Sequence, residues 1–219
     1  MTSASCDLED LDAIIFDLGG VILNLEYERT ITEFKKDLPA LDASVFYGKE
    51  AQLPFYSEYE IGRISTADLV SRFNVHHGSS FSGDLFKTCW NAMILDFPPR
   101  RIALLQRLRA SGKRVFLLSN INELHDLAVE ESYARLGHPE KFHDLFDKVY
   151  YSYQVGRRKP NADIFELVLS ENRLRPDRCL FIDDSAHHVL GAKKTGLHAV
   201  HLQKPETILD LPVFKVLQK

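Results

Sequence analysis

Five short apolar segments constrain the fold of this chain more than any other feature. Three of them are almost continuously apolar, as strands buried on both faces should be: AIIFD (13–17), RVFLLSN (114–120) and CLFIDD (179–184). The other two are KVYYS (148–152) and HAVHL (198–202). Helical patterns separate most of these segments, and strands that alternate with helices predict parallel βαβ units. We therefore expect an α/β fold with a doubly wound, Rossmann-like parallel sheet.

Local signals mark where the helices between these strands begin. Pro98 and Pro99 precede RRIALLQRLRASG, and Pro160 precedes NADIFELVLSENRL. Proline is favoured in the first turn of a helix, where its missing N–H costs nothing. Asn122 and Ser185 are suitable N-caps for ELHDLAVEESYARLG and AHHVLGAKKTG. The sequence therefore predicts four helices among the later strands.

Residues 24–95 break the alternation of strands and helices. They contain amphipathic stretches such as YERTITEFKKDL, STADLVSRF and GDLFKTCWNAMI, and no convincing strand. Ser65 and Thr66 have the pattern of a helix start. We interpret 24–95 as a helical cap domain inserted after the first strand. Residues 1–23 and 96–219 then form the core domain.

Charge and cysteine content limit the class of protein. The chain has 27 Lys plus Arg against 31 Asp plus Glu, a net charge of −4, whereas nucleic acids and anionic membranes attract a positive field. Cys6, Cys89 and Cys179 are too widely spaced for a disulfide framework or zinc ribbon. The acidic start lacks a basic signal region, and no apolar run approaches the ~20 residues of a membrane span. We expect a cytoplasmic protein that binds neither nucleic acid nor membrane; no pattern indicates an oligomeric state.

Polar residues end three of the apolar segments. Asp17 ends the first, Ser119 and Asn120 end the second, and Asp183 and Asp184 end the segment at 179–184. In an open parallel sheet the carboxyl ends of the strands face one crevice, where ligands bind. These side chains are therefore expected to converge, although any one of them alone is equally typical of a strand end or a helix cap.

The segment after Asp17 allows close approach to a ligand. Gly19 and Gly20 let the backbone turn sharply. A carboxylate just before them can bind a metal, and it can attack phosphorus when it is held in line beside a cation. The alternative is a strand-end aspartate that hydrogen-bonds a neighbouring amide.

Further residues fit a phosphate and metal site. Asp183 and Asp184 would repel a third carboxylate unless a cation lay among them, and oxygen ligands alone favour Mg²⁺. The alternative for this pair is a helix cap with a solvated neighbour. Lys159 can place its ammonium group over the same crevice. Ser119 and the amide of Asn120 can donate to a phosphoryl oxygen.

Taken in order, these residues resemble the four motifs of the haloacid dehalogenase-like hydrolase superfamily. The motifs are Asp17-x-Gly-Gly-Val, Leu118-Ser119-Asn120, Gly156-x-x-Lys159-Pro160 with Ile164-Phe165, and Phe181-Ile182-Asp183-Asp184-Ser185. The insert resembles that superfamily's small helical cap. The FDLG start is similar to that of phosphatases of small sugar phosphates.

The resemblance implies a Mg²⁺-dependent phosphatase with a defined metal site. Asp17 would be both the nucleophile that becomes an aspartyl phosphate and a Mg²⁺ ligand. Gly19 would supply a backbone carbonyl to the metal. Asp184 would bind it directly, and Asp183 directly or through water.

The resemblance also implies how the phosphoryl group is held. Ser119 and the Asn120 amide would bind the phosphoryl oxygens, and Lys159 would orient Asp17. Charge stabilisation of this kind is the main contribution in phosphoryl transfer.

One position departs from the family pattern. Many of these phosphatases have a second aspartate two residues after the nucleophile, as general acid and base, where this chain has Gly19. General acid–base catalysis contributes about 10²–10⁴-fold, or roughly 3–5 kcal/mol of barrier. A cap residue or water can replace the acid, the substrate can have a good leaving group, or turnover can be weak.

In the cap, residues 59–65 resemble the family's substrate-facing loop. Glu60 and Arg63 would reach sugar hydroxyls or phosphate, although a surface ion pair explains this spacing equally well. Arg157 and Arg158 are interpreted as solvated charges. The nine histidines show no convincing transition-metal spacing and are interpreted as helix-surface or strand residues.

The sequence therefore favours a Mg²⁺-dependent phosphatase acting on a small phosphorylated metabolite. The alternative from another class is a weak or inactive protein that binds phosphorylated ligands on the same scaffold. Dehalogenase chemistry would need no metal, so Asp183 and Asp184 argue against it. A phosphosugar mutase must move protons in both directions, which the glycine at position 19 disfavours.

Overall fold

The computed structural model describes residues 7–42 and 53–218. At its centre is a sheet of five parallel strands in the order β3-β2-β1-β4-β5, which confirms the predicted doubly wound sheet. Each strand ends one residue before the corresponding sequence segment does. The strands are β1 (Ala13–Phe16), β2 (Arg114–Ser119), β3 (Lys148–Tyr151), β4 (Cys179–Asp183) and β5 (His198–His201).

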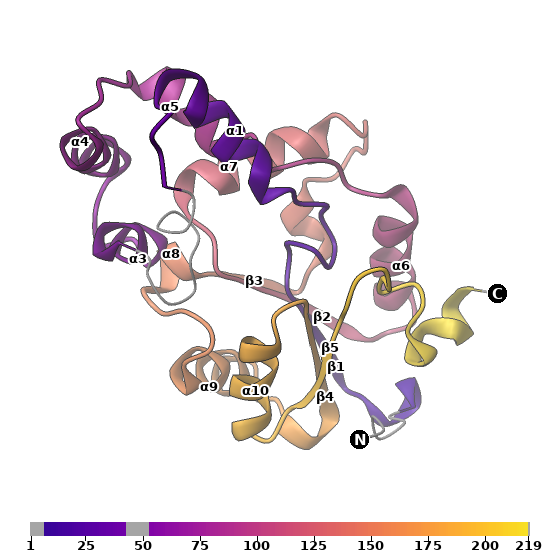
Figure 1. Cartoon of the computed structure of the whole chain (residues 1–219). Coiled ribbons are helices and arrows are strands. Elements are labelled where there is room, and N and C mark those ends of the chain that lie inside the picture. Colours follow the sequence, from indigo (N-terminus) through magenta and orange to yellow (C-terminus); the bar gives the residue numbers. More distant parts are fainter. Residues whose placement is uncertain (1–6, 43–52, 219) are drawn as a thin grey trace.

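Helices cover both faces of the sheet. Successive side chains of a strand point to opposite faces, and here both sets are apolar and need to be buried. Ile14 and Phe16 of β1 face one apolar cluster, and Ala13 and Ile15 face the other. The first cluster takes side chains from α6 (Pro99–Ala110) and α7 (Glu123–Ala134). The second takes them from α9 (Ala162–Glu171) and α10 (Ala186–Lys194), which lie across the sheet from α6 in Figure 1.

The predicted helix starts are confirmed in part. Pro99 is the first residue of α6, and Asn122 caps α7 by accepting a hydrogen bond from the backbone N–H of His125 at 3.0 Å. Ser185 has the N-cap position of α10, but its side chain makes no capping bond. Its backbone N–H instead donates to Asp183 Oδ1 at 2.8 Å. The end of the preceding strand β4 (Cys179–Asp183), and not the serine side chain, therefore orients this helix start.

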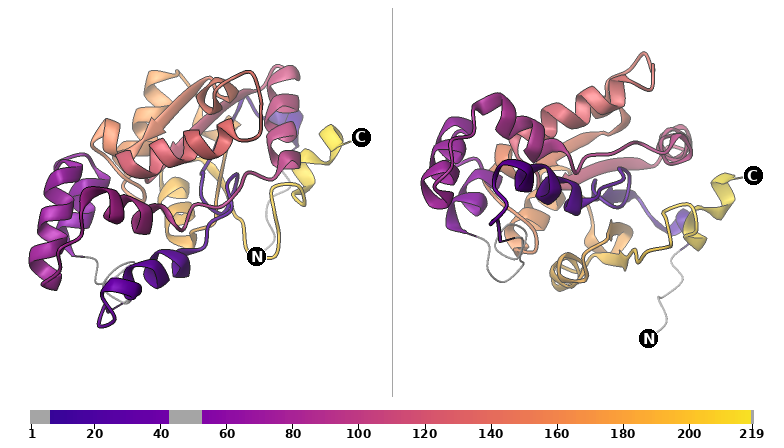
Figure 2. Two further views of the ribbon diagram at one scale, coloured as in Figure 1. Left: turned by 90° about the horizontal axis from the view of Figure 1, so that it is seen from above. Right: turned by 45° about the horizontal axis from the view of Figure 1, so that its top comes forward.

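The described residues between 24 and 95 form helices and no strand, apart from a single bridge between Leu25 and Ile94. Ser65 begins its helix with a complete capping box to Asp68, as the sequence predicted. The four helices lie together at one end of the molecule in both views of Figure 2. They are α1 (Tyr27–Asp37), α3 (Pro54–Glu60), α4 (Thr66–His77) and α5 (Gly83–Asn91).

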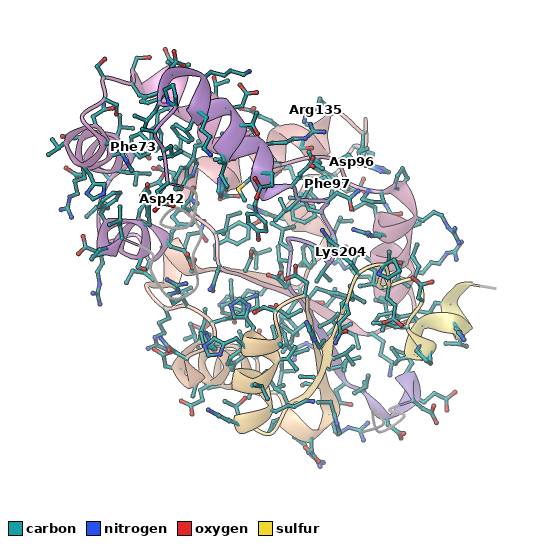
Figure 3. The ribbon with its side chains drawn as sticks, in the orientation of Figure 1. Asp42, Phe73, Asp96, Phe97, Arg135 and Lys204 are labelled. Carbon is teal, nitrogen blue, oxygen red and sulfur yellow. The ribbon has the colours of Figure 1, made fainter. Side chains whose placement is uncertain are left out.

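This helical layer has an apolar cluster of its own, centred on aromatic rings. The ring of Phe73 (Figure 3) lies 5.0 Å from that of Phe34 and 5.1 Å from that of Phe86. Leu124 of α7 belongs to the same cluster, and Trp90 Nε1 donates to Asn122 Oδ1 at 3.3 Å. The layer is therefore packed onto the start of α7, directly after the end of β2.

Short helices complete the described chain. Cys89 and Cys179 are buried free thiols. Cys6 lies outside the described residues. In the described parts, no helix is both long and apolar enough to traverse a bilayer. The short elements are η1 (Leu8–Asp10), η2 (Phe142–Leu145), α8 (Ser152–Val155), η3 (Pro176–Arg178) and η4 (Pro212–Gln218).

Gly191 lets α10 pack closely against the turn at Pro160. A Cβ atom at position 191 would lie 2.4 Å from the Pro160 carbonyl oxygen. Alanine favours a helix by about 1 kcal/mol over glycine, but we expect the clash to outweigh this and Gly191→Ala to lower the free energy of unfolding by about 1–3 kcal/mol. Urea unfolding would measure it.

Gly83→Ala is the matched control, because nothing lies within 4 Å of a Cβ atom there. It should leave stability unchanged or raise it slightly. A Gly191→Ala protein as stable as the wild type would show that this close packing does not hold in solution.

Candidate active site

A buried lysine joins the ends of three neighbouring strands. Lys159 Nζ lies 2.7 Å from Asp17 Oδ1, 2.7 Å from Asp183 Oδ2 and 2.8 Å from the Leu118 carbonyl oxygen. Asp17 follows β1, Asp183 ends β4 and Leu118 lies in β2, so the residues come from adjacent strands at one edge of the sheet. The lysine is fully buried. Its three N–H groups therefore have three acceptors, as burial of an ammonium group requires.

The carboxylates outnumber the ammonium group that faces them. One oxygen each of Asp17, Asp183 and Asp184 lies within 4.8 Å of the others. Burial, together with the charges of Asp183 and Asp184, raises the pKa of Asp17 to about 7 despite Lys159. Burial would also raise the pKa of Asp183, but Lys159 and His188 hold it below its usual value. Burial opposes the charge on Lys159, yet Asp17 and Asp183 raise its pKa.

This donor set fits a hard divalent cation. Three carboxylates around one ammonium group leave excess negative charge, and Mg²⁺ prefers oxygen ligands. Gly20 has φ +74°, and a Cβ atom there would lie 2.4 Å from Asp184 Oδ2. The glycine therefore keeps space open beside the most exposed of the three acids. The residues present fit a magnesium ion that also has water or phosphate oxygens in its shell.

Asn120 holds the lysine segment in place. Its side-chain N–H donates to the Lys159 carbonyl oxygen, and its Oδ1 accepts from the Lys159 backbone N–H, both at 2.9 Å. The side chain is therefore used inside the protein. The group of Asn120 that was expected to bind a phosphoryl oxygen is its backbone amide, which is not used in these two hydrogen bonds. Ser119 is buried at the end of β2, where it pairs with Tyr151 of β3.

Gly19, where the family pattern often has an acid, lies against an apolar side chain. A Cβ atom at this position would be 2.3 Å from Leu25 Cδ1. An aspartate at position 19 would therefore require Leu25 to move. The position offers backbone groups alone.

Glu60 and Arg63, both expected to contact the substrate, have different surroundings in the structure. Glu60 Oε1 lies 3.3 Å from Arg158 Nε, while Arg63 is exposed. Arg158 also donates to Ser57 Oγ at 3.2 Å, so its interpretation as a solvated charge was wrong: it bridges α3 and the segment before Lys159. Burial raises the pKa of Glu60, although the charges of Arg158 and Lys159 lower it. Glu60 is thus a carboxylate of the helical layer whose pKa is influenced by the charge of the buried lysine.

His188 is a site residue that the sequence analysis missed. It was interpreted as a surface histidine, but its Nδ1 lies 3.1 Å from both carboxylate oxygens of Asp183. It stands in the first turn of α10, whose start is oriented by Asp183 itself. The sequence did contain a signal for this contact, because His188 lies about one helical turn after the Asp183-Asp184 pair.

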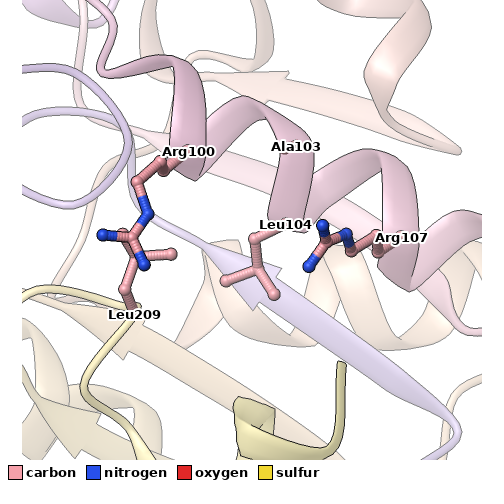
Figure 4. A pocket seen from close by; sticks show the side chains of 5 residues that line it. All are labelled: Arg100, Ala103, Leu104, Arg107 and Leu209. Atoms are coloured by element: carbon pink, nitrogen blue, oxygen red, sulfur yellow. The ribbon is translucent and has the colours of Figure 1, made fainter. Parts of the chain in front are cut away.

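A separate pocket lies away from these acids. It has a volume of about 150 Å³ between α6 and the segment after β5 (Figure 4). It shares no residue with the site around Lys159. Its lining consists of Arg100, Ala103, Leu104, Arg107 and Leu209.

The comparisons with known proteins agree with this geometry. A family model described as haloacid dehalogenase-like hydrolase matches residues 11–196. D-ribitol-5-phosphate phosphatase from Bacteroides thetaiotaomicron is 29% identical over 84% of this chain and 87% of its own. A sesquiterpene phosphatase from Aspergillus oryzae is 27% identical over 87% and 89%. A family enzyme from Bacteroides thetaiotaomicron, solved as a complex with magnesium and inorganic phosphate, has a TM-score of 0.79 at 29% identity and covers 90% of this chain and 96% of that one.

Removal of the lysine charge should destabilise the protein strongly. Lys159→Met leaves two buried carboxylates without their ammonium partner, and breaking a buried ion pair in this way costs about 3–5 kcal/mol. Urea unfolding at pH 8 measures the change. Lys148→Met is the control, because its ion pair with Glu171 is largely solvated and should contribute less than about 1 kcal/mol. Equal effects of the two substitutions would contradict this role for Lys159.

The stability of Asp17→Asn relative to wild type should rise with pH in the metal-free protein. The folded-state pKa of Asp17 is about 7 against 3.8 for the free residue. Between these values the native state binds more protons than the unfolded state, so this carboxyl lowers wild-type stability as pH rises. In EDTA, we expect the stability difference, variant minus wild type, to grow by at least about 1 kcal/mol from pH 5 to pH 8. A difference independent of pH would contradict the raised pKa.

Proposed function

The chain belongs to the haloacid dehalogenase-like hydrolases, and we propose that it is a Mg²⁺-dependent phosphatase of a small phosphorylated metabolite. The observation that carries the proposal is a cluster of three carboxylates, two of which contact one buried lysine, at the carboxyl ends of β1 and β4. Two curated relatives that span most of the chain are phosphatases. A sugar or sugar-alcohol phosphate is the substrate class that the ribitol-phosphate relative suggests.

Asp17 is proposed as the nucleophile. Lys159 fixes one of its oxygens and favours its charged form. The carboxylate attacks phosphorus in line, the bond from phosphorus to the leaving oxygen breaks, and that oxygen takes up a proton. Water then hydrolyses the aspartyl phosphate, which releases inorganic phosphate and restores Asp17.

The remaining roles are proposed from the same geometry. Asp17, Asp183, Asp184 and the carbonyl oxygen of Gly19 would hold Mg²⁺, with Asp183 bound directly or through water. When bound, Mg²⁺ supplies positive charge against the phosphoryl oxygens and the carboxylates. Ser119 and the backbone amide of Asn120 would hold the phosphoryl group at the end of β2.

Residues 24–95 are proposed to act as a cap domain over this site, with 1–23 and 96–219 as the core domain. The support is the separate apolar cluster of these helices and the ion pair between Glu60 of α3 and Arg158 next to the lysine. A cap that contacts the lysine segment can admit the substrate and then exclude water. A cytoplasmic location is proposed as well, on the acidic net charge and the unpaired thiols of Cys89 and Cys179.

Glu60 is proposed to perform the proton transfer that Gly19 cannot. Its carboxyl is largely buried, its pKa is raised by that burial, and it is electrostatically coupled to Lys159. A carboxyl group with a raised pKa is suited to protonate a leaving alkoxide. Arg63, which is exposed, is proposed to contact the outer part of the substrate.

The test of the function is phosphate release from a panel of sugar and sugar-alcohol phosphates. We expect wild-type turnover with Mg²⁺, loss of turnover in EDTA, and a decrease of at least about 10³-fold in Asp17→Asn, because the nucleophile is removed. Asp163→Asn, an exposed acid on α9, is the control and should retain activity.

Three outcomes would contradict the proposal in distinct ways. Wild-type release no greater than that of Asp17→Asn would favour the alternative, an inactive binder of phosphorylated ligands, for which the glycine at position 19 is the supporting observation. Activity that survives EDTA would favour chemistry without a metal. Transfer of the phosphoryl group within the sugar, without release, would indicate a mutase.

A second experiment tests Glu60. Glu60→Gln should lower kcat for an alkyl phosphate by about 10²-fold or more and have little effect on acetyl phosphate, whose leaving group needs no proton. Arg63→Gln should change both substrates equally and weakly. If Glu60→Gln lowers kcat equally for both substrates, Glu60 binds substrate without transferring a proton.

A further inference from the structure

A second group of metal-ligating side chains lies outside the site around Lys159. Asp126 and Glu130 are one helical turn apart on α7, and His143 lies on η2. One ligand atom of each lies within 4.8 Å of the other two. Side chains at i and i+4 project from the same face of a helix, so α7 presents both carboxylates to the imidazole.

The two carboxylates and a phenol converge on one nitrogen atom. His143 Nε2 lies 3.1 Å from Glu130 Oε1, 3.5 Å from Asp126 Oδ1 and 3.2 Å from Tyr151 Oη. Its hydrogen-bond partner is the phenol. Asp126 Oδ1 and Glu130 Oε1 are both buried and accept no well-aligned hydrogen bond from the described chain, but both lie within ion-pair distance of His143. One ring N–H cannot satisfy all three oxygens.

A neighbouring hydrogen bond holds Asp126 in its orientation. Its other oxygen, Oδ2, accepts from Tyr153 Oη at 2.7 Å, and that hydroxyl accepts from Gln154 Nε2 at 2.9 Å. Asp126 is 8% exposed, so its Oδ1 is directed into the cluster and away from water. Hydrogen-bonded outer groups of this kind typically orient metal ligands.

We propose that Asp126, Glu130 and His143 bind a divalent transition-metal ion, with Zn²⁺ as the ion that this donor set favours. Two buried carboxylate oxygens face one imidazole, so even a protonated His143 leaves one negative charge unbalanced, and such a buried charge is costly unless a further cation neutralises it. An imidazole nitrogen with two carboxylates suits Zn²⁺, whereas Mg²⁺ and Ca²⁺ prefer oxygen alone. The phenol of Tyr151 lies next to the imidazole nitrogen, 3.2 Å from it.

The position of this site indicates a structural role. The helix α7 begins directly after Asn122, and its first turn contacts the helical layer: Thr66 Oγ1 donates to Glu123 Oε2 at 2.8 Å. Tyr151 of β3 pairs with Ser119. An ion held by α7 and η2 would therefore fasten the helix that follows the proposed phosphate-binding segment, without contacting the reacting atoms. The proposal does not depend on the phosphatase activity.

The test is Zn²⁺ binding to the full chain after EDTA treatment, by calorimetry in excess Mg²⁺, with the thermal midpoint as a second readout. Wild type should bind Zn²⁺ and gain thermal stability from it. Glu130→Gln and His143→Gln each remove a ligand and should weaken binding at least tenfold. Tyr153→Phe removes the outer hydrogen bond and should weaken it about 10–100-fold.

Two controls separate this site from the acids around Lys159. Glu131→Gln changes the next, exposed residue of α7, and Asp184→Asn removes an acid of the other site; both should retain Zn²⁺ binding. With Co²⁺, the absorption bands of wild type should change in His143→Gln and persist in Asp184→Asn. Unchanged Zn²⁺ affinity in both Glu130→Gln and His143→Gln, or its loss in Asp184→Asn, would overturn the proposal. So would a wild-type protein that binds no Zn²⁺.

Discussion

The site depends on the burial of one ammonium group. Lys159 has no contact with water, and three acceptors from three strands replace the solvent it has lost. This holds Asp17 and Asp183 together, although like charges repel, and it fixes the ends of β1, β2 and β4 relative to one another. Most of the remaining architecture can be understood as support for this arrangement: Asn120 clamps the backbone of the lysine segment, and Gly191 admits α10 against it.

A single ammonium group does not balance the site. Burial, together with the charges of Asp183 and Asp184, raises the pKa of Asp17 to about 7, so that much of this carboxyl is protonated at neutral pH when no cation is bound. A divalent cation reverses this, since it favours the ionised form of each carboxylate. In the proposed mechanism the metal and Asp17 are therefore coupled: the same ion that would stabilise the phosphoryl oxygens would also keep Asp17 charged. The helical layer adds Glu60, whose carboxylate pairs with Arg158 and is also influenced by the charge of Lys159.

Much of the fold followed from the sequence, and most of the parts that did not have a common cause. Strand positions were predicted to within one residue, because apolar runs and polar strand ends are local patterns. Arg158 and Asn120 were misjudged or only partly understood, because the partner of each lies far away in the chain, whereas His188 contacts Asp183 only five residues before it and was missed despite this local signal. The partner of Arg158 lies in α3, and the side chain of Asn120 turns toward Lys159 instead of a ligand. The cluster of Asp126, Glu130 and His143 was missed for the same reason.

The sequence by itself determined the alternation of strands and helices, the strand ends at which Asp17 and Asp183 stand, and the family, because these are carried by spacing along the chain. Only the tertiary structure decided which groups share the buried charge of Lys159, why position 19 lies against Leu25, and where Glu60 points. The physical reason is that a charge loses its water only when the whole fold closes around it. Its partners are then chosen by packing in three dimensions, which no local pattern records.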